Sequence, residues 1–162
     1  MTVALARVDD RLVHGQVVLG WGNALRAKRV LVVDDAAAAP GWERDLLAAS
    51  AGELQVRVVA VADAAAALAE EARRPGAAIV LFRSPLAALA AVESGAELAE
   101  LNLGGLHHAV GKQRVLDYVY LDAADRGALA KLAARGVRLT AQDLPSSAPV
   151  DARVWLAAGP GA

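Results

Sequence analysis

Short apolar runs rich in valine and leucine alternate along the first half of the chain with stretches that suit helices of about ten residues. The runs lie at residues 3–8, 30–33, 56–61 and 77–82. Regular alternation of this kind is typical of a parallel sheet whose crossover helices cover its faces. The sequence therefore predicts an α/β fold in which residues 1–162 form a single domain. Its mostly parallel twisted β-sheet is expected to carry helices on both faces.

Turn and capping residues indicate where the intervening helices begin and end. Ser84 followed by Pro85 suits an N-cap and a first helical residue, and Pro40 suits the first turn of an earlier helix. Gly52 and Gly95 are expected to end two of these helices. The expected helices span about residues 16–27, 40–51, 63–74 and 85–94.

The last third of the chain departs from this rhythm. Asp122 and Asp125 have the spacing of a capping box, which predicts a helix that Gly136 ends. Residues 154–156 are expected to form a short edge strand or a docking tail. The other expected elements are strands at residues 100–103, 114–121 and 137–141, with a loop and C-terminal tail over residues 145–162.

Bulk composition limits the classes of partner and chemistry. The formal net charge of −1 gives no global attraction to nucleic acid or to an acidic membrane. Because the chain has no cysteine, disulfides, thiolate catalysis and cysteine-ligated zinc are excluded. The amino terminus lacks a signal-peptide pattern, and no apolar run approaches the ~20 residues of a transmembrane helix. We therefore expect a soluble, cytoplasmic protein.

The segment RVDDRLVHGQV, residues 7–17, places an imidazole where a strand is expected to give way to a helix. Chemistry in open α/β sheets concentrates in loops at the carboxyl ends of strands. His14 would lie beside unpaired helix amides that favour an anion, and Arg11 adds a fixed cation suited to phosphate. Asp9 or Asp10 could hold and orient the other ring nitrogen. This pattern indicates a histidine that accepts a phosphoryl group; the alternative is a helix-capping or buried structural histidine.

Other candidate sites are weaker. Gly104-Gly105 predicts either a tight turn or a loop whose bare backbone approaches His14 and its phosphate. His107-His108 lacks a third metal ligand, so a polar loop is expected there, and no nucleotide-binding glycine fingerprint occurs. The adjacent acids Asp34-Asp35 could bind Mg²⁺, but helix capping is the favoured interpretation.

A phosphatase is the alternative to a histidine that accepts and passes on a phosphoryl group. Histidine phosphatases and phosphoglycerate mutases carry Arg-His-Gly directly after the first strand. Here the triplet is Val13-His14-Gly15, and Arg11 is displaced from that position. The phosphatase interpretation therefore ranks well below phosphoryl acceptance.

The segment at residues 7–17, with Trp21 seven residues after His14, resembles the IIB component of the mannose/fructose/sorbose family of the bacterial sugar phosphotransferase system. The similarity extends over nearly the whole chain. One departure is His107-His108, where many members carry an apolar or aromatic residue. The supporting segments are Val32-Val33-Asp34-Asp35, Arg83-Ser84-Pro85, Leu101-Asn102-Leu103-Gly104-Gly105 and Gly111-Lys112.

The resemblance implies a cytoplasmic phosphoryl carrier, a protein-phosphohistidine–sugar phosphotransferase. His14 would take a phosphoryl group from a phosphohistidine on a separate IIA protein, forming an intermediate linked through Nδ1. It would pass the group to a sugar bound by the membrane IIC/IID components, at which the protein would dock peripherally. The resemblance also implies no metal or organic cofactor and a possible homo-oligomer. The alternative function is a regulatory module whose phosphorylation reports carbon supply without transport.

The expected site consists of His14 and a set of residues that bind or orient phosphate. Since two large partners must reach it in turn, we expect His14 on a shallow, flat or convex surface. The phosphate-binding or orienting set is Asp10, Arg11, Gly15, Gln16, Gly104 and Gly105.

Overall fold

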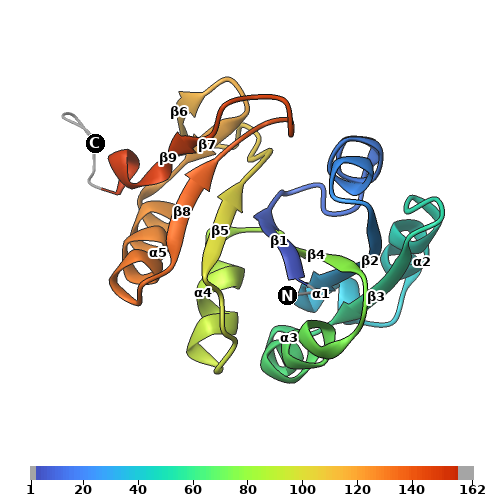
Figure 1. Ribbon diagram of the computed structural model, residues 1–162. Coiled ribbons are helices and arrows are strands. Elements are labelled where there is room, and N and C mark those ends of the chain that lie inside the picture. Colours follow the sequence, from blue (N-terminus) through green and yellow to red (C-terminus); the bar gives the residue numbers. More distant parts are fainter. Residues whose placement is uncertain (1–2, 157–162) are drawn as a thin grey trace.

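The structure is a computed structural model that describes residues 3–156 (Figure 1). In this part of the chain, seven strands form one sheet in the order β3-β2-β4-β1-β5-β8-β9. Neighbouring strands run parallel, apart from the edge strand β9, which is antiparallel to β8. The predicted α/β class and mostly parallel sheet are therefore confirmed. The strands of the sheet are β1 (Val3–Val8), β2 (Ala27–Val33), β3 (Gln55–Val59), β4 (Ala77–Phe82), β5 (Glu100–Leu103), β8 (Arg138–Ala141) and β9 (Val150–Asp151).

Helices pack on both faces of this sheet and create two apolar cores. Alternate strand residues point to opposite faces, so Val30 and Val32 join one core while Leu31 and Val33 join the other. Among residues 3–156, no helix combines the length and the apolar character that crossing a membrane requires. The first core is covered by η1 (Gln16–Gly22), α1 (Asp35–Ala38) and α2 (Trp42–Ala49), and the second by α3 (Ala64–Arg73), α4 (Pro85–Glu93) and α5 (Ala123–Ala134).

Two of the predicted helix caps are present as expected. The Ser84 side chain accepts a hydrogen bond from the Ala87 amide at 3.1 Å, at the start of α4. Asp122 and Asp125 form the predicted capping box of α5: the Asp125 amide donates to Asp122 Oδ1 at 2.8 Å, and the Asp122 amide donates to Asp125 Oδ2 at 3.1 Å. Both caps are encoded within four consecutive residues.

The helix expected over residues 40–51 is wrong at its start. A short helix, α1, already begins after Asp34 and ends at Ala38, and α2 begins only at Trp42. Ala39 is extended at ψ 149°, as expected for a residue that precedes proline. Pro40 therefore separates two helices rather than opening one.

The strand expected over residues 114–121 is also wrong. The chain reverses at Asp117-Tyr118, giving an antiparallel hairpin of β6 (Gln113–Leu116) and β7 (Val119–Leu121) outside the main sheet. Valine, leucine and tyrosine are frequent on both sides of the turn, so the composition does not reveal the reversal. The edge strand likewise lies before residues 154–156, at β9, and a 3₁₀ turn, η3 (Ala152–Trp155), follows it.

The chain first adds strands on one side of β1 and later on the other side. The direction in which the sheet grows therefore reverses beside β1, which lies between β4 and β5. The connection after β1 runs through η1 on one face, and the connection after β4 runs through α4 on the other. In open α/β sheets, such a reversal places a crevice at the carboxyl ends of the strands. The segments after β1 and β5 meet there, since the Asp10 amide donates to the Gly105 carbonyl at 2.9 Å.

Candidate functional site

His14 lies at this edge of the sheet with one ring nitrogen held by a buried acid. Its Nε2 is buried and lies 3.0 Å from Oδ2 of Asp9, and Asp9 is itself fully buried. Only 14% of the His14 side chain is exposed, so the ring lies mostly within the loop and not free on the surface. The short loop that positions the ring includes Leu12 at φ 57°, a left-handed conformation that few non-glycine residues adopt. The chain thus folds back tightly between Asp9 and His14.

Asp9 remains ionised although it is buried. Burial on its own raises the pKa of Asp9, but His14, the Arg11 amide and the positive charge of Arg7 lower it, and the net pKa lies below the usual value. The Arg11 amide donates to Oδ1 at 3.1 Å, and the Gly105 amide donates to Oδ2 at 3.3 Å. Of the two acids considered from the sequence, Asp9 therefore contacts His14.

A buried arginine, Arg7, supports the site from the carboxyl end of β1. Its Nη1 donates to Asn102 Oδ1 at 2.6 Å and to the Gln142 carbonyl at 2.7 Å, while Nη2 donates to the Asp143 carbonyl at 3.1 Å. The guanidinium carbon lies 5.1 Å from the ring centre of Trp21, close enough for a cation–π contact. Burial lowers the pKa of Arg7, and the charge of Asp9, whose Oδ2 lies 3.8 Å from Nε, opposes this change. One cation thus joins the ends of β1, β5 and β8.

The two glycines after β5 allow the backbone to lie against these charged groups. A Cβ at Gly104 would overlap the guanidinium of Arg7. At Gly105, a Cβ would lie 3.1 Å from Cε1 of His107 and 3.5 Å from both Nη2 of Arg11 and Oδ1 of Asp9. The prediction that this loop approaches the His14 site therefore agrees with the geometry.

A polar chain leads from Arg11 to the segment after β8. Arg11 Nη2 donates to Gln16 Oε1 at 3.0 Å, and Gln16 Nε2 donates to Asp143 Oδ1 at 2.8 Å. Trp21 Nε1 donates to the Asp143 carbonyl at 3.2 Å. The Arg11 side chain is 46% exposed, so it can face a ligand while Gln16 limits its movement.

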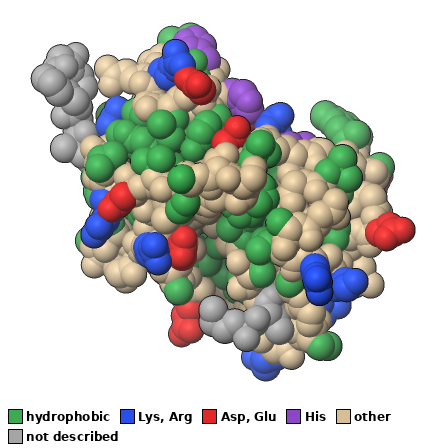
Figure 2. Space-filling view, turned by 45° about the horizontal axis from the view of Figure 1, so that its top comes forward, with side chains coloured by type: hydrophobic (Ala, Val, Ile, Leu, Met, Phe, Trp, Pro, Cys, Tyr) green, Lys and Arg blue, Asp and Glu red, His purple; other side chains and the backbone are tan. Residues whose placement is uncertain are grey.

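Asp10 holds a second histidine on the rim of the site. Oδ1 of Asp10 lies 2.6 Å from Nδ1 of His107, and Oδ2 accepts a hydrogen bond from the His107 amide at 2.7 Å. Figure 2 shows histidine side chains along the upper part of one face, next to basic and acidic side chains. Asp10 therefore orients the loop after Gly105 and not the ring of His14.

The helix after His14 differs from the expected α-helix. It is a seven-residue π-helix, η1. The Val18 amide near its start donates a hydrogen bond to the His14 carbonyl at 3.0 Å. Gly15 lies at its N-cap with φ −53°, and a Cβ there would meet nothing within 4 Å, so neither space nor backbone requires glycine.

A model of the sorbose subfamily IIB component of the PTS, the sugar phosphotransferase system, matches residues 3–158. The chain belongs to this family. The sorbose-specific EIIB component of Klebsiella pneumoniae is 32% identical over 152 residues, which are 93% of each chain. The mannose-specific EIIAB component of Escherichia coli K12 is 34% identical over 140 residues, which are 86% of this chain and 43% of that protein. The crystal structure of the IIBSor domain of the Klebsiella pneumoniae sorbose permease is 31% identical, covers 96% of both chains and has a TM-score of 0.85.

Three residues that support the site of this IIB component carried no predicted role, namely Arg7, Asn102 and Asp143. Arg7 left a signal in the sequence, because it interrupts an apolar run that becomes a strand covered on both faces. Asn102 interrupts the next strand in the same way and also donates to Thr140 Oγ1 at 3.1 Å. Asp143 lies in a polar loop, and nothing in its local sequence indicated its contacts.

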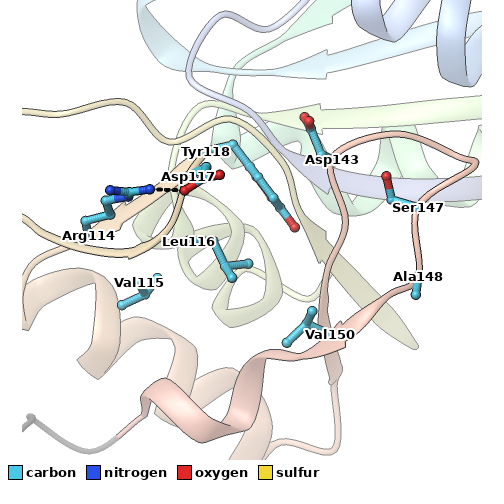
Figure 3. A pocket seen from close by; sticks show the side chains of 9 residues that line it. All are labelled: Arg114, Val115, Leu116, Asp117, Tyr118, Asp143, Ser147, Ala148 and Val150. Atoms are coloured by element: carbon cyan, nitrogen blue, oxygen red, sulfur yellow. Dashed lines mark hydrogen bonds and ion pairs between the residues drawn. The ribbon is translucent and has the colours of Figure 1, made fainter.

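A cavity of about 620 Å³ lies next to Asp143, the residue at which the polar chain from Arg11 ends in this IIB component. Figure 3 shows it between the β6–β7 hairpin and the loop that carries Asp143 and Ser147, with Tyr118 pointing into the space. Burial, followed by the negative charge of Asp143, raises the pKa of Tyr118. Asp143 thus accepts a hydrogen bond from Gln16 in the polar chain and also lines this cavity.

Of the two acids after β2, Asp34 caps α1, as the favoured interpretation predicted. Asp34 Oδ2 accepts from the Ala37 amide at 2.9 Å, and the fork of Arg83 donates to both Asp34 oxygens at 3.0 and 2.8 Å. Burial on its own raises the pKa of Asp34, but these bonds outweigh it and the net pKa is lowered. Among residues 3–156, no three histidine or acidic side chains gather as metal ligands would.

Asp34→Asn is expected to lower the free energy of unfolding by about 1–3 kcal/mol at neutral pH, because it removes charge-assisted hydrogen bonds. Since the folded pKa of Asp34 lies below its unfolded value, this stabilisation is present above the unfolded pKa and is lost as pH falls through the folded one. Urea unfolding of both proteins between about pH 7 and about pH 2.5 should show the difference shrinking below about pH 4. A difference that stays constant with pH would contradict this assignment.

Proposed function

We propose that His14 of this sorbose-subfamily IIB component accepts a phosphoryl group from a phosphorylated IIA protein and passes it to a sugar. The sugar would be held by membrane IIC and IID components, where the protein docks from the cytoplasm. The observation that carries the proposal is the contact between Nε2 of His14 and the buried carboxylate of Asp9 at 3.0 Å. This contact assigns a role to each nitrogen of the His14 ring.

An ionised carboxylate can only accept hydrogen bonds, so the nitrogen facing Asp9 carries the hydrogen. Nδ1 of His14 is then left with its lone pair and is the nucleophile of a neutral imidazole. In the transfer, the nitrogen–phosphorus bond of the donor breaks as a bond from Nδ1 to phosphorus forms. The ring becomes cationic, and Asp9 stabilises this charge without moving a proton.

The residues around His14 suit a phosphoryl group that must be both accepted and released. Phosphoryl transfer relies on positioning and on charge stabilisation more than on covalent chemistry. Arg11 offers an exposed guanidinium, Gln16 limits its movement, and Gly105 keeps the adjacent surface free of a side chain. We assign Gly104 a supporting role, since it makes room for Arg7.

The comparison with the mannose-specific EIIAB component supports the choice of donor. By its name that relative joins an A and a B part, and this chain matches 43% of its length. We infer that a IIA component supplies the phosphoryl group to the B part represented here.

The test is phosphorylation of the purified protein with ³²P-labelled phospho-IIA. The wild type should acquire a label that acid removes and base does not, and His14→Ala should acquire none. Circular dichroism and urea unfolding would establish that the variant is folded. A folded His14→Ala protein that is still labelled would overturn the proposal, as would a wild type that IIA does not label.

A further inference from the structure

Two consecutive acids of the β1–η1 loop each contact a histidine, through different ring nitrogens. Asp9 contacts Nε2 of His14 at 3.0 Å, whereas Asp10 contacts Nδ1 of His107 at 2.6 Å. The first pair is almost fully buried, while the side chain of His107 is 54% exposed. The ring nitrogen of His107 that Asp10 does not hold is therefore Nε2.

His107 faces the same small surface as the phosphate-binding residues. A Cβ built on Gly105 would lie 3.1 Å from Cε1 of His107 and 3.5 Å from Nη2 of Arg11. Cε1 joins the two ring nitrogens, so the ring of His107 borders the bare backbone of Gly105 through the edge that carries both Nδ1 and Nε2. Oδ1 of Asp9, the acid that contacts His14, lies 3.5 Å from the same Cβ position.

Resting on the function proposed above, we propose that His107 is a second phosphate-contacting residue: as an imidazolium it donates a hydrogen bond from Nε2 to the phosphoryl group on His14. The Asp10–His107 pair then complements the Asp9–His14 pair. One histidine forms the bond to phosphorus, and the other neutralises a phosphoryl oxygen.

Proton uptake by His107 accompanies this contact. When the ring of His107 is neutral and donates from Nδ1 to Asp10, Nε2 keeps its lone pair. A phosphoryl dianion next to Nε2 favours the protonated ring, which gains a donor there. The charged groups that face His107 are Asp10, which favours the cation, and, across Gly105, Arg11 and Asp9. When the phosphoryl group leaves, the proton returns to solvent.

The experiment measures single-turnover transfer from ³²P-labelled phospho-IIA over about pH 5.5 to about pH 8.5, the range in which imidazole titrates. We expect His107→Ala to reduce the rate by about tenfold at the acid end and by less at the alkaline end, because it removes a charge-assisted hydrogen bond. His107→Arg supplies a permanent cation and should transfer faster than His107→Ala across the whole range. The matched control is His108→Ala, since the His108 ring packs edge-on against Tyr120 with ring centres 5.6 Å apart.

The loop should keep its place in these variants, because Asp10 Oδ2 accepts from the backbone amide of residue 107 whatever its side chain. If His107→Ala transfers at the wild-type rate with the wild-type pH profile, the inference is overturned while the role of His14 stands. If His107→Arg is as slow as His107→Ala, a cation at this position is not the required feature, and the inference also fails. A wild type that IIA does not label would instead reject the underlying function.

Discussion

Asp9→Asn is expected to slow phosphoryl transfer to His14 by about a thousandfold or more, with little change in the fold. An asparagine can present its amide hydrogens to Nε2 of His14, which then becomes an acceptor and leaves the hydrogen on Nδ1. The nucleophilic lone pair is lost in that tautomer. The substitution also removes the negative charge that stabilises the ring once it carries the phosphoryl group. Rapid-quench measurement of transfer from phospho-IIA at neutral pH would give the rate.

The matched control for this prediction is Asp45→Asn, which removes an exposed acid on α2 and should transfer at the wild-type rate. Urea unfolding would show how much stability each variant retains. If a folded Asp9→Asn protein transfers as fast as the wild type, Asp9 does not set the tautomer of His14. The chemical part of the proposed function would then need another orienting group.

Gly104→Ala is expected to lower the free energy of unfolding by about 3–5 kcal/mol, the usual range when a buried ion pair is broken. The added methyl group would overlap the guanidinium of Arg7, which is completely buried and has little room to shift. Its hydrogen bonds to Asn102 and to the carbonyls of Gln142 and Asp143 would be lost together. Urea denaturation at neutral pH, followed by circular dichroism, measures the change.

A double-mutant cycle with Arg7→Met isolates the cause. The nearest atoms to a Cβ at residue 104 all belong to Arg7, so Gly104→Ala should cost much less stability when the guanidinium is absent. Arg7→Met alone should destabilise strongly, because Asn102 and two carbonyls lose their donor. If the two substitutions are additive, the close packing of Gly104 on Arg7 does not explain the need for glycine.

The features that could be predicted from the sequence depend on neighbouring residues. The Ser84 cap, the capping box at Asp122 and the strands at residues 3–8 and 77–82 are each defined within a few positions, and each appears where expected. The reversal at Asp117 is not predicted because the residues on both sides of the turn are equally rich in valine, leucine and tyrosine. Pro40 was misplaced because proline suits both a helix start and the connection between two helices.

The candidate site could be predicted from a local motif, but its internal geometry could not. Residues 7–17 identified His14 and its basic neighbour Arg11, whereas the choice between Asp9 and Asp10 depended on how one loop folds against another. The partial burial of His14 follows from segments that meet only in three dimensions. Contacts between residues that lie far apart in the sequence leave no periodic or spacing signal in a single sequence.

The bonds of Arg7 also have a consequence for the order in which the protein is made. Two of its acceptors, the carbonyls of Gln142 and Asp143, lie 135 and 136 residues further along the chain. While the ribosome is still adding the helices, the earliest strand already carries a charge whose acceptors do not yet exist, and burying it then would be costly. The central strand can bury this charge at low cost only after residues 142 and 143 have been made. The bonds of Arg7 therefore favour a late closing of this part of the sheet.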